Sequence, residues 1–576
     1  MTYVPPIAEQ RFLLRHVVRM DELGGHPDFA EAGADLVDAI LEGAGAFAAG
    51  EFAPLNRVGD QVGARWSPEG VTMPPGFRQA YRAYVEGGWG TLAGPPEYGG
   101  QGLPLTLAAV VMEDLGSANM ALSLIMMLTP ASVEALSRHG SEELKRSWLS
   151  KLVSGEWNGT MNLTEPQAGS DVGALKTRAV PLGDGTYSIT GQKIFITFGE
   201  HDLTDNIVHL VLARLSDAPP GTKGISLFLV PKFHRGPDGG PAAPNDVRCV
   251  SIEHKLGIHA SPTCVMSYGD SGQCIGWLIG EENGGMRAMF TMMNNARLNV
   301  GLQGVSIAER ATQAAVIYAS SRVQSARAGW ASRESVAIIQ HPDVRRMLLR
   351  MKALTQAARA LAYYAWGQAD RAQLGDGAAK ARVDLLTPLV KAYGTDVGVE
   401  VASLGVQVHG GMGFIEETGA AQHYRDARIA PIYEGTNGIQ AADLVGRKLG
   451  LEGGAVLASL IADMRAEGAG EPVLMAHVDA CEAVARQLGE AGVEDRLAAS
   501  YPFLTMLSVA VCGWLMERQL RAAAEGEEGD GAFLAMKKAA ARFYLDQIVP
   551  EATGLKAAAS APADALYSVP EDAFAA

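Results

Sequence analysis

The order of the predicted elements constrains the fold of this chain more than any other feature of its sequence. Residues up to about position 157 have helical spacing. Short apolar or alternating runs follow, broken by Gly, Pro, Asp and Asn, and helical spacing then returns and continues to the end. A helical, β, helical, helical order is uncommon. It predicts a mainly α fold of the α+β class with a separate antiparallel β-domain in the middle.

A chain of 576 residues is too long for one simple core, so we expect several domains. The expected domains are an N-terminal helical domain over 1–157 with a short extension over 1–36, a middle β-domain over 158–284, a C-terminal helical bundle over 285–450, and an additional C-terminal helical domain over 455–576. The strands expected in the β-domain are 187–190, 193–198, 207–212, 225–230, 250–252, 264–267 and 275–279. Residues 235–246 are expected to form an exposed loop.

Composition excludes several classes of function. The five cysteines show no CxxC pair and no His at zinc-ligand spacing, so we expect buried reduced thiols and no metal site. A net charge of −16 disfavours binding to nucleic acid. The N-terminus does not resemble a signal peptide, and no window reaches the roughly 18 uninterrupted apolar residues of an integral membrane segment. We therefore expect a cytoplasmic protein.

Two segments near the predicted β-domain are candidates for a cofactor surface. The segment Met161-Asn-Leu-Thr-Glu-Pro-Gln-Ala-Gly-Ser-Asp171 is either a plain entry loop or a loop whose amides and hydroxyls meet a polar cofactor edge. The strand Lys193-Ile-Phe-Ile-Thr197 could place an aromatic ring and a hydroxyl against a planar heterocycle, although such a strand taken alone indicates core. No Rossmann-type GxGxxG or GK[ST] loop accompanies them.

Glu434 is the candidate catalytic residue. It lies in Ile432-Tyr-Glu-Gly-Thr-Asn-Gly438, where the Gly/Thr/Asn stretch should begin a helix. A surface carboxylate is the usual interpretation of any Glu, but the apolar residues Ile429, Ile432 and Tyr433 should desolvate this one. Desolvation raises the pKa of a carboxyl above its reference of about 4.3, as a base working near neutrality requires.

Five motifs in order resemble the acyl-CoA dehydrogenase family over roughly residues 10–449. Two of them are the Thr-Glu-Pro-x-Ala-Gly-Ser-Asp loop and the Lys-Ile-Phe-Ile-Thr strand quoted above. The other three are Pro95-Pro-Glu-Tyr-Gly-Gly-Gln-Gly-Leu103, Gln407-Val-His-Gly-Gly-Met-Gly-Phe414 and Ile-Tyr-Glu-Gly-Thr436. The segment 245–266 and the extra C-terminal helices also resemble the long bacterial members, the group of the 3-methylmercaptopropionyl-CoA dehydrogenase.

The resemblance implies FAD bound between the β-domain and the second helical bundle. The cofactor-binding residues that it implies are Met161, Leu163, Thr164, Gly169, Ser170, Phe195, Thr197, Arg322, Gln324, Gln407, Gly410, Gly411 and Thr436. Of these, Arg322, Gln324, Gln407, Gly410 and Gly411 are implied to reach the FAD of a neighbouring subunit, which implies a homodimer or a tetramer. The substrate-binding residues that it implies are Ser170, Arg297, Glu434 and Gly435.

The implied reaction is α,β-dehydrogenation of an acyl-CoA to the trans-2-enoyl-CoA, a step of fatty acid β-oxidation. Glu434 removes the α-proton, its own N–H helps to hold the thioester carbonyl, and electrons pass from FAD to an electron-transfer flavoprotein. The acyl group is left open between 3-methylmercaptopropionyl and short, medium or longer fatty acyl chains. Two alternatives are an acyl-CoA oxidase that uses oxygen and a DNA-associated flavoprotein of the same fold.

Overall fold

The computed structural model describes residues 3–526 and 530–576, so residues 1–2 of the expected N-terminal extension and residues 527–529 of the expected C-terminal domain lie outside it. The described chain packs into two compact units. One comprises residues 43–296, and the other combines residues 3–42 with residues 297–576. The fold is mainly α, as the sequence predicts, with 62% helix and one large sheet.

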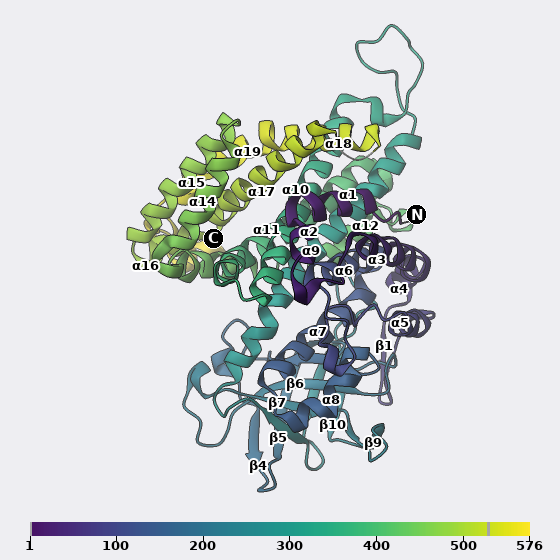
Figure 1. Cartoon of the computed structure of the whole chain (residues 1–576), viewed down its shortest axis with the longest axis vertical. Coiled ribbons are helices and arrows are strands. Elements are labelled where there is room, and N and C mark those ends of the chain that lie inside the picture. The colour runs from purple at the N-terminus through teal and green to yellow at the C-terminus, as the bar shows by residue number, and fades with distance from the viewer. Residues whose placement is uncertain (1–2, 527–529) are drawn as a thin grey trace. The chain divides into compact units, whose positions relative to one another are not determined.

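The helices of the 43–296 unit precede its large sheet (Figure 1). They are α4 (Leu55–Val62), α5 (Phe77–Glu86), α6 (Leu105–Ala118), α7 (Met120–His139) and α8 (Glu142–Ser154), while α3 (Ala34–Phe47) ends at the start of this unit. The start of α8 illustrates local control by sequence. The hydroxyl of Ser141 accepts a hydrogen bond from Leu144 N at 3.3 Å, and the helix ends at Gly155 with φ +80°.

The large sheet contains nearly all of the strands that the sequence predicts. Its order is β10-β11-β5-β12-β7-β6-β3, with β4 paired to β5. The bounds are β3 (Asn158–Asn162), β4 (Arg178–Pro181), β5 (Tyr187–Thr197), β6 (Ile207–Ala213), β7 (Ser226–Pro231), β10 (Val247–Ile252), β11 (Thr263–Tyr268) and β12 (Ile275–Ile279). The two runs expected at 187–190 and 193–198 are one continuous strand, β5.

Strand β3 departs from the sequence prediction in two ways. The sequence predicts no strand at these residues, and β3 runs parallel to β6 in a sheet whose other ladders are all antiparallel. It is fully buried although most of its residues are polar. Their side chains find partners within the fold: Thr160 Oγ1 lies 2.8 Å from His209 Nδ1, and Asn162 Oδ1 accepts from the Tyr268 hydroxyl at 2.7 Å. Buried hydrogen bonding therefore replaces the apolar alternation that sequence analysis seeks.

Two small antiparallel hairpins complete the β-structure of this unit. They are β1 (Arg65–Ser67) with β2 (Gly70–Thr72), and β8 (Phe233–Arg235) with β9 (Pro241–Pro244). The second hairpin occupies much of the segment expected to be a loop. All four residues of β9 are nevertheless exposed, so the expectation of exposure holds and the expectation of irregular structure does not.

Helices make up most of the second unit, together with a long connection over residues 322–337 (Figure 1). Its helices are α1 (Ile7–Leu13), α2 (Met20–Gly24), the greater part of α9 (Gly285–Ser321), α10 (Pro342–Gln373), α11 (Gly377–His409), α12 (Ala420–Ala427), α13 (Asn437–Asp443), α14 (Ala455–Gly468), α15 (Pro472–Glu490), α16 (Val493–Ala498), α17 (Ser500–Glu525), α18 (Gly531–Phe543), α19 (Val549–Thr553) and α20 (Asp564–Tyr567). Helices α10 and α11 form its longest antiparallel pair, and α17 packs against both of them.

Glycines allow α9 and α11 to approach each other closely. A Cβ on Gly304 would lie 2.0 Å from Gly394 O, and one on Gly301 would lie 2.3 Å from Val390 O. Real Cβ atoms do not tolerate such distances, so any larger residue would force the two helices apart. This contact matters for function because α9 and α11 carry the two cations nearest to Glu434.

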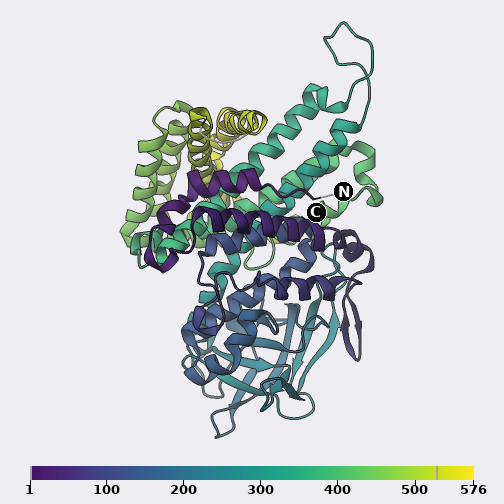
Figure 2. The ribbon, with the colours of Figure 1, turned by 45° about the vertical axis from the view of Figure 1, so that its right-hand side comes forward.

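Helix α1, near the N-terminus, lies beside α18 of the C-terminal region within the second unit (Figure 2). Glu9 of α1 forms a buried ion pair with Lys537 of α18 at 2.8 Å, and Arg359 of α10 lies 3.9 Å from the same carboxylate. Phe12 packs edge-on against Phe533. The N-terminal extension is thus an integral part of the helical unit and not a loose arm.

Candidate functional site

Glu434 lies in a tight turn, residues 431–437, which we call the Glu434 turn. The backbone of Glu434 has φ +55°, and Gly435 follows with φ +80°. A left-handed conformation is rare for a residue with a side chain and is found where the surrounding structure imposes it. The turn ends where Thr436 caps α13, its hydroxyl accepting from Ile439 N at 3.1 Å, so the helix begins where the sequence predicts it.

Two cations of the same unit act on the Glu434 carboxyl. Arg297 of α9 is buried, and its Nε donates to Glu434 O at 3.4 Å. Lys391 of α11 is fully buried and donates to Asn437 Oδ1 at 2.8 Å. Burial raises the pKa of Glu434 above its usual range, whereas the charges of Arg297 and Lys391 oppose that rise. The half-buried carboxyl is therefore a stronger base than an ordinary surface Glu, as the sequence predicts.

The pKa of Lys391 is lowered to about 7, because burial penalises its charged form more than the charges of Glu434 and Asp396 favour it. Lys391, Asp396 and Asn437 were not singled out in the sequence. The only signal was a lysine inside the apolar run Leu-Leu-Thr-Pro-Leu-Val-Lys-Ala-Tyr, which ends at Tyr393. Such a lysine must be buried with a partner, but the run does not reveal which partner.

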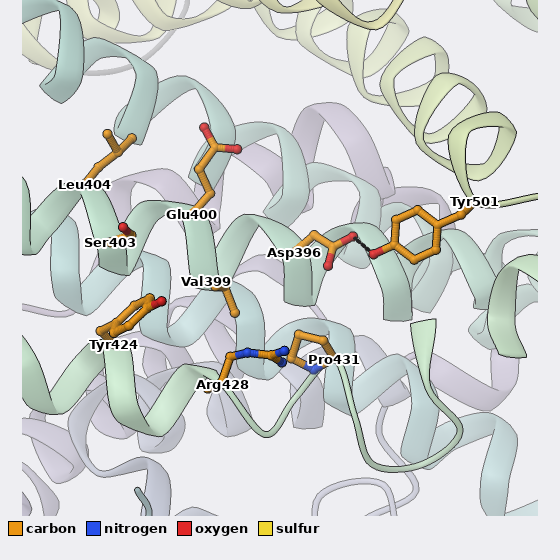
Figure 3. Close-up of a pocket in the computed structure, with 9 residues that line it drawn as sticks. All are labelled: Asp396, Val399, Glu400, Ser403, Leu404, Tyr424, Arg428, Pro431 and Tyr501. Atoms are coloured by element: carbon orange, nitrogen blue, oxygen red, sulfur yellow. Dashed lines mark hydrogen bonds between the residues drawn. The ribbon is translucent and has the colours of Figure 1, made fainter. Parts of the chain in front are cut away.

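A pocket of about 500 Å³ lies in the helical unit beside the start of the Glu434 turn (Figure 3). Its walls include Asp396 and Glu400 of α11, Tyr501 of α17, and Arg428 and Pro431 from the segment after α12. Figure 3 shows the Tyr501 hydroxyl directed at Asp396, with which it forms a 2.7 Å hydrogen bond. Asp396, Glu400 and Arg428 place three ionisable groups among the apolar residues of these walls, which is unlike a binding site for an acyl chain.

In the 43–296 unit, a buried ion pair joins the two predicted cofactor segments. Lys193 of β5 donates to Glu165 Oε1 at 2.8 Å and to Leu163 O at 2.9 Å. Ile194 N donates to Thr164 O at 2.9 Å. Burial alone would raise the pKa of Glu165, but Lys193 and several hydrogen bonds outweigh burial and lower that pKa to about 2. The loop that follows β3 is thereby fixed against β5.

This fixed loop and strand present groups that fit a flavin. Phe195 is 58% exposed and has φ +59°, so its ring is uncovered on a strand whose neighbouring residues are buried. Thr197 is half-buried two residues further along β5, and Leu163 and Thr164 are half-buried in the loop that follows β3. An uncovered aromatic ring with nearby hydroxyls matches a flat heterocycle with polar edges. Of the remaining predicted residues, Met161 is buried in β3, and Gly169 and Ser170 are exposed.

The residues implied to reach a neighbouring subunit are exposed on the helical unit. Arg322 and Gln324 follow α9, and Gln407 lies in the last turn of α11. Gly410, with φ +60°, and Gly411 follow it, and a Cβ on either would meet open space. His409, which lies between Gln407 and Gly410, is buried. Its Nδ1 lies 2.7 Å from Gly405 O, and its ring stacks on Tyr318. It is thus a packed histidine.

The structure brings the predicted residues together in two groups, one in each unit. Thr436, Gly435, Glu434 and Arg297 meet at the Glu434 turn, and the residues of the 161–170 loop and β5 meet through the Lys193 pair. Within residues 3–526 and 530–576, no group of three His, Cys, Asp or Glu side chains could hold a metal ion. In the same part of the chain, α7 alone has the length and apolarity of a membrane-crossing helix, and 83% of the relevant window is buried in the fold.

Four family profiles match consecutive parts of the chain. They are the acyl-CoA dehydrogenase N-terminal domain over residues 37–156, the middle domain over 160–271, the C-terminal domain over 283–449, and the domain described as acetyl-CoA dehydrogenase C-terminal like over 460–570. Together they cover most of the chain in the order expected from the sequence.

Individual relatives agree with these profiles. The chain is 47% identical over 574 residues to the 3-methylmercaptopropionyl-CoA dehydrogenase of Ruegeria pomeroyi, covering 96% of this chain and 97% of that one. It is 38% identical over 578 residues to a butyryl-CoA dehydrogenase of Syntrophomonas wolfei subsp. wolfei, covering 94% of each. Among solved structures, Caenorhabditis elegans ACDH-11 in complex with C11-CoA shares the fold with a TM-score of 0.79 at 19% identity, covering 100% of this chain and 95% of that one.

Three findings agree with one another. Family profiles cover most of the chain, relatives are well above 30% identical along nearly its full length, and a candidate carboxylate base lies in the expected turn. The chain belongs to the acyl-CoA dehydrogenase family and is an FAD-dependent oxidoreductase.

Proposed function

We propose that Glu434 is the base of this dehydrogenase and removes the α-proton of an acyl-CoA thioester, giving the trans-2-enoyl-CoA. The observation that carries the assignment is the position of Glu434: a half-buried carboxyl with a raised pKa, on a left-handed backbone turn between two buried cations. A base of raised pKa matches the task because it remains deprotonated near neutrality and still binds the transferred proton well.

The backbone of the turn supports the same step. An α-C–H is too weak an acid unless the developing enolate oxygen is stabilised, and a fixed N–H of Glu434 is a suitable donor. Arg297 holds the next peptide group, between Glu434 and Gly435, by donating to Glu434 O. The bound FAD supplies the acceptor for the β-hydride. Phe195, Thr197, Thr164, Gly169 and Ser170 are the residues of the β-unit that would hold it.

The substrate class is proposed from the relatives. Their printed names indicate 3-methylmercaptopropionyl-CoA and butyryl-CoA, so we propose a short acyl-CoA for this chain, with the 3-methylmercaptopropionyl thioester as the first candidate. The higher identity to the first relative favours it. A panel of acyl-CoA thioesters of increasing length, scored by bleaching of the flavin, tests this assignment. Faster bleaching by long-chain than by short-chain thioesters would contradict it.

The proposed partners are a second copy of this chain and an electron-transfer flavoprotein. Uncovered apolar side chains support the first: Phe414 is 86% exposed, and Met412, Ile415 and Tyr424 nearby are each more than 40% exposed. Burying such a patch against a second copy is favourable. Family membership supports the second partner and the proposed cytoplasmic location. Release of hydrogen peroxide in air at the rate of turnover would identify an oxidase instead.

Replacing Glu434 by Gln tests the role of this residue. The variant Glu434→Gln keeps the shape of the side chain but cannot accept a proton, so we expect FAD to remain bound and turnover to fall by several orders of magnitude, on the scale seen when a catalytic group is lost. Glu417→Gln, an exposed carboxylate in the preceding loop, is the matched control. Flavin bleaching at the wild-type rate in Glu434→Gln would refute the assignment.

A further inference from the structure

The Glu434 turn cannot maintain its own backbone conformation. A left-handed residue with a side chain costs on the order of 1–3 kcal/mol and persists only when the surroundings impose it. Within the turn, the closing bond is Asn437 N donating to Pro431 O at 3.0 Å. The position of Asn437 therefore determines whether the turn stays closed around Glu434.

Asn437 is held by the polar groups of a single face of α11. Its Nδ2 donates to Asp396 Oδ1 at 2.8 Å and to Ala392 O at 3.1 Å, and its Oδ1 accepts from Lys391 Nζ at 2.8 Å. A backbone carbonyl and an ionised carboxylate can only accept, so Ala392 and Asp396 fix which way the amide faces. Asn437 is almost completely buried.

Asp396 is held in turn by the C-terminal domain. Its second carboxylate oxygen, Oδ2, accepts from the hydroxyl of Tyr501 at 2.7 Å (Figure 3). Tyr501 lies in the first turn of α17, in the part of the chain that matches the separate C-terminal profile over residues 460–570. Burial raises the pKa of Asp396, and the hydrogen bond from Tyr501 opposes that rise and favours the carboxylate.

A second tyrosine from the same domain provides a natural comparison. The hydroxyl groups of Tyr544 and Tyr393 lie 2.7 Å apart, so this pair also joins the C-terminal domain to α11. Both rings are buried. Within the described part of the chain, neither tyrosine forms a hydrogen bond with Asn437 or Asp396. The hydrogen bond of Tyr501 thus leads to the Glu434 turn, whereas the hydrogen bond of Tyr544 serves only to pack the helices.

We propose that the C-terminal domain positions the catalytic turn: Tyr501 holds Asp396, Asp396 holds Asn437, and Asn437 keeps the turn closed around Glu434. Tyr501 is a positioning residue and has no contact with the reacting atoms. The inference rests on the proposed role of Glu434 and gives the additional domain a part in the reaction that family membership alone does not assign.

The test compares Tyr501→Phe with Tyr544→Phe in the full-length, FAD-loaded protein. Each variant loses one hydroxyl that reaches α11. Hydrogen exchange measured by mass spectrometry on a peptide spanning 429–440 reports on the turn without depending on turnover. We expect exchange there to rise roughly tenfold in Tyr501→Phe, the factor that loss of about one buried hydrogen bond implies. In Tyr544→Phe it should stay within about twofold of wild type.

Turnover provides the second measurement. We expect kcat to fall roughly five- to tenfold in Tyr501→Phe with a smaller change in KM, because the base is displaced while the thioester-binding surface is intact. Tyr544→Phe should retain its kcat even where its thermal stability falls. A lower kcat together with faster exchange at 429–440 in Tyr501→Phe alone supports the inference.

The outcomes separate this inference from the assignment of Glu434. If both tyrosine variants behave alike in exchange and in kcat while Glu434→Gln is inactive, the positioning role is refuted and the catalytic role stands. If Glu434→Gln turns over at the wild-type rate, the catalytic role is refuted. The exchange data then still show whether Tyr501 holds the turn.

Discussion

The ammonium group of Lys193 lies 2.8 Å from the carboxylate of Glu165, and both side chains are almost completely buried. The pair joins strand β5 to the loop that follows β3 and so fixes the surface on which Phe195 is uncovered. Removing one partner of such a pair leaves an uncompensated buried charge, which typically costs about 3–5 kcal/mol. We therefore expect Lys193→Met to lose about that much free energy of unfolding and to bind FAD more weakly, as measured by denaturant titration and by flavin retention.

The pH dependence of Glu165→Gln checks the same pair. The folded-state pKa of Glu165 is lowered to about 2 from an ordinary value of 4.5, so its contribution to stability is present above pH 4.5 and is lost as the pH falls toward 2. The stability difference between wild type and Glu165→Gln should therefore shrink over that window. A difference that stays constant from pH 6 to the acid limit of about 2 would contradict the lowered pKa.

Lys391 should influence the acid limb of the activity profile, which is the pH range over which kcat rises with pH. Its charge lowers the pKa of Glu434 against the effect of burial. Because Glu434 acts as a base only when deprotonated, kcat should rise with pH through that pKa. In Lys391→Met the opposing charge is gone, so the pKa of Glu434 should rise further and the acid limb should move to higher pH.

Lys380 gives the matched control for this prediction. It lies on the same helix, α11, but its side chain is 65% exposed and pairs with Asp384. Surface charges of this kind interact weakly across solvent. Lys380→Met should leave the acid limb unchanged, and an acid limb that fails to move in Lys391→Met would show that the lysine does not act on Glu434.

Gly304 should tolerate no side chain. A Cβ at this position would lie 2.0 Å from Gly394 O, so α9 and α11 must separate and carry Arg297 away from Lys391. Overpacking costs about 1–3 kcal/mol or more, which exceeds the gain of about 1 kcal/mol from replacing Gly by Ala in a helix. We expect Gly304→Ala to be destabilised and nearly inactive. Gly489→Ala, in α15 where a Cβ meets open space, should be neutral or slightly stabilised in the same thermal scan.

Phe414 tests the proposed homodimer. If its ring is buried against a second copy, Phe414→Asp should place a charge in that interface and shift the mass measured by light scattering toward the monomer. Phe574→Asp, equally exposed at 78% but close to the C-terminus, is the control and should keep the wild-type mass. An unchanged mass for Phe414→Asp would place the subunit contact elsewhere.

Elements with strong periodicity could be predicted from the sequence, and elements that depend on tertiary partners could not. Strand β6 is an apolar run interrupted only by His209, and the range predicted for it lies within one residue of the observed strand. Strand β3 was not predicted because Asn158, Thr160 and Asn162 are polar. The partners of Thr160 and Asn162 include His209 and Tyr268, which lie far along the chain. A pattern of side-chain types cannot reveal a hydrogen bond to a residue more than a hundred positions away, such as Tyr268.

The candidate site also contains residues that the local sequence reveals and residues whose role depends on tertiary partners. Glu434 and the start of α13 could be predicted because a glutamate, a glycine and a capping threonine stand in adjacent positions. Lys391, Asp396 and Tyr501 could not, because each is unremarkable in its own segment and acquires a role only where α11, α13 and α17 meet. Burial raises the pKa of Glu434, and the charges of Arg297 and Lys391, two residues distant in the sequence, oppose that rise.

The ion pair between Glu9 and Lys537 has a consequence for how the protein is made. At rates of synthesis of about 5–20 residues per second, the second partner leaves the ribosome on the order of a minute after the first. Residues 43–296 can complete their own core in the interval, while Phe12 and Leu13 of the opening helix remain without the helices that cover them. The nascent chain therefore carries an unburied apolar segment at its leading end, a binding site for chaperones until the last helices have been translated.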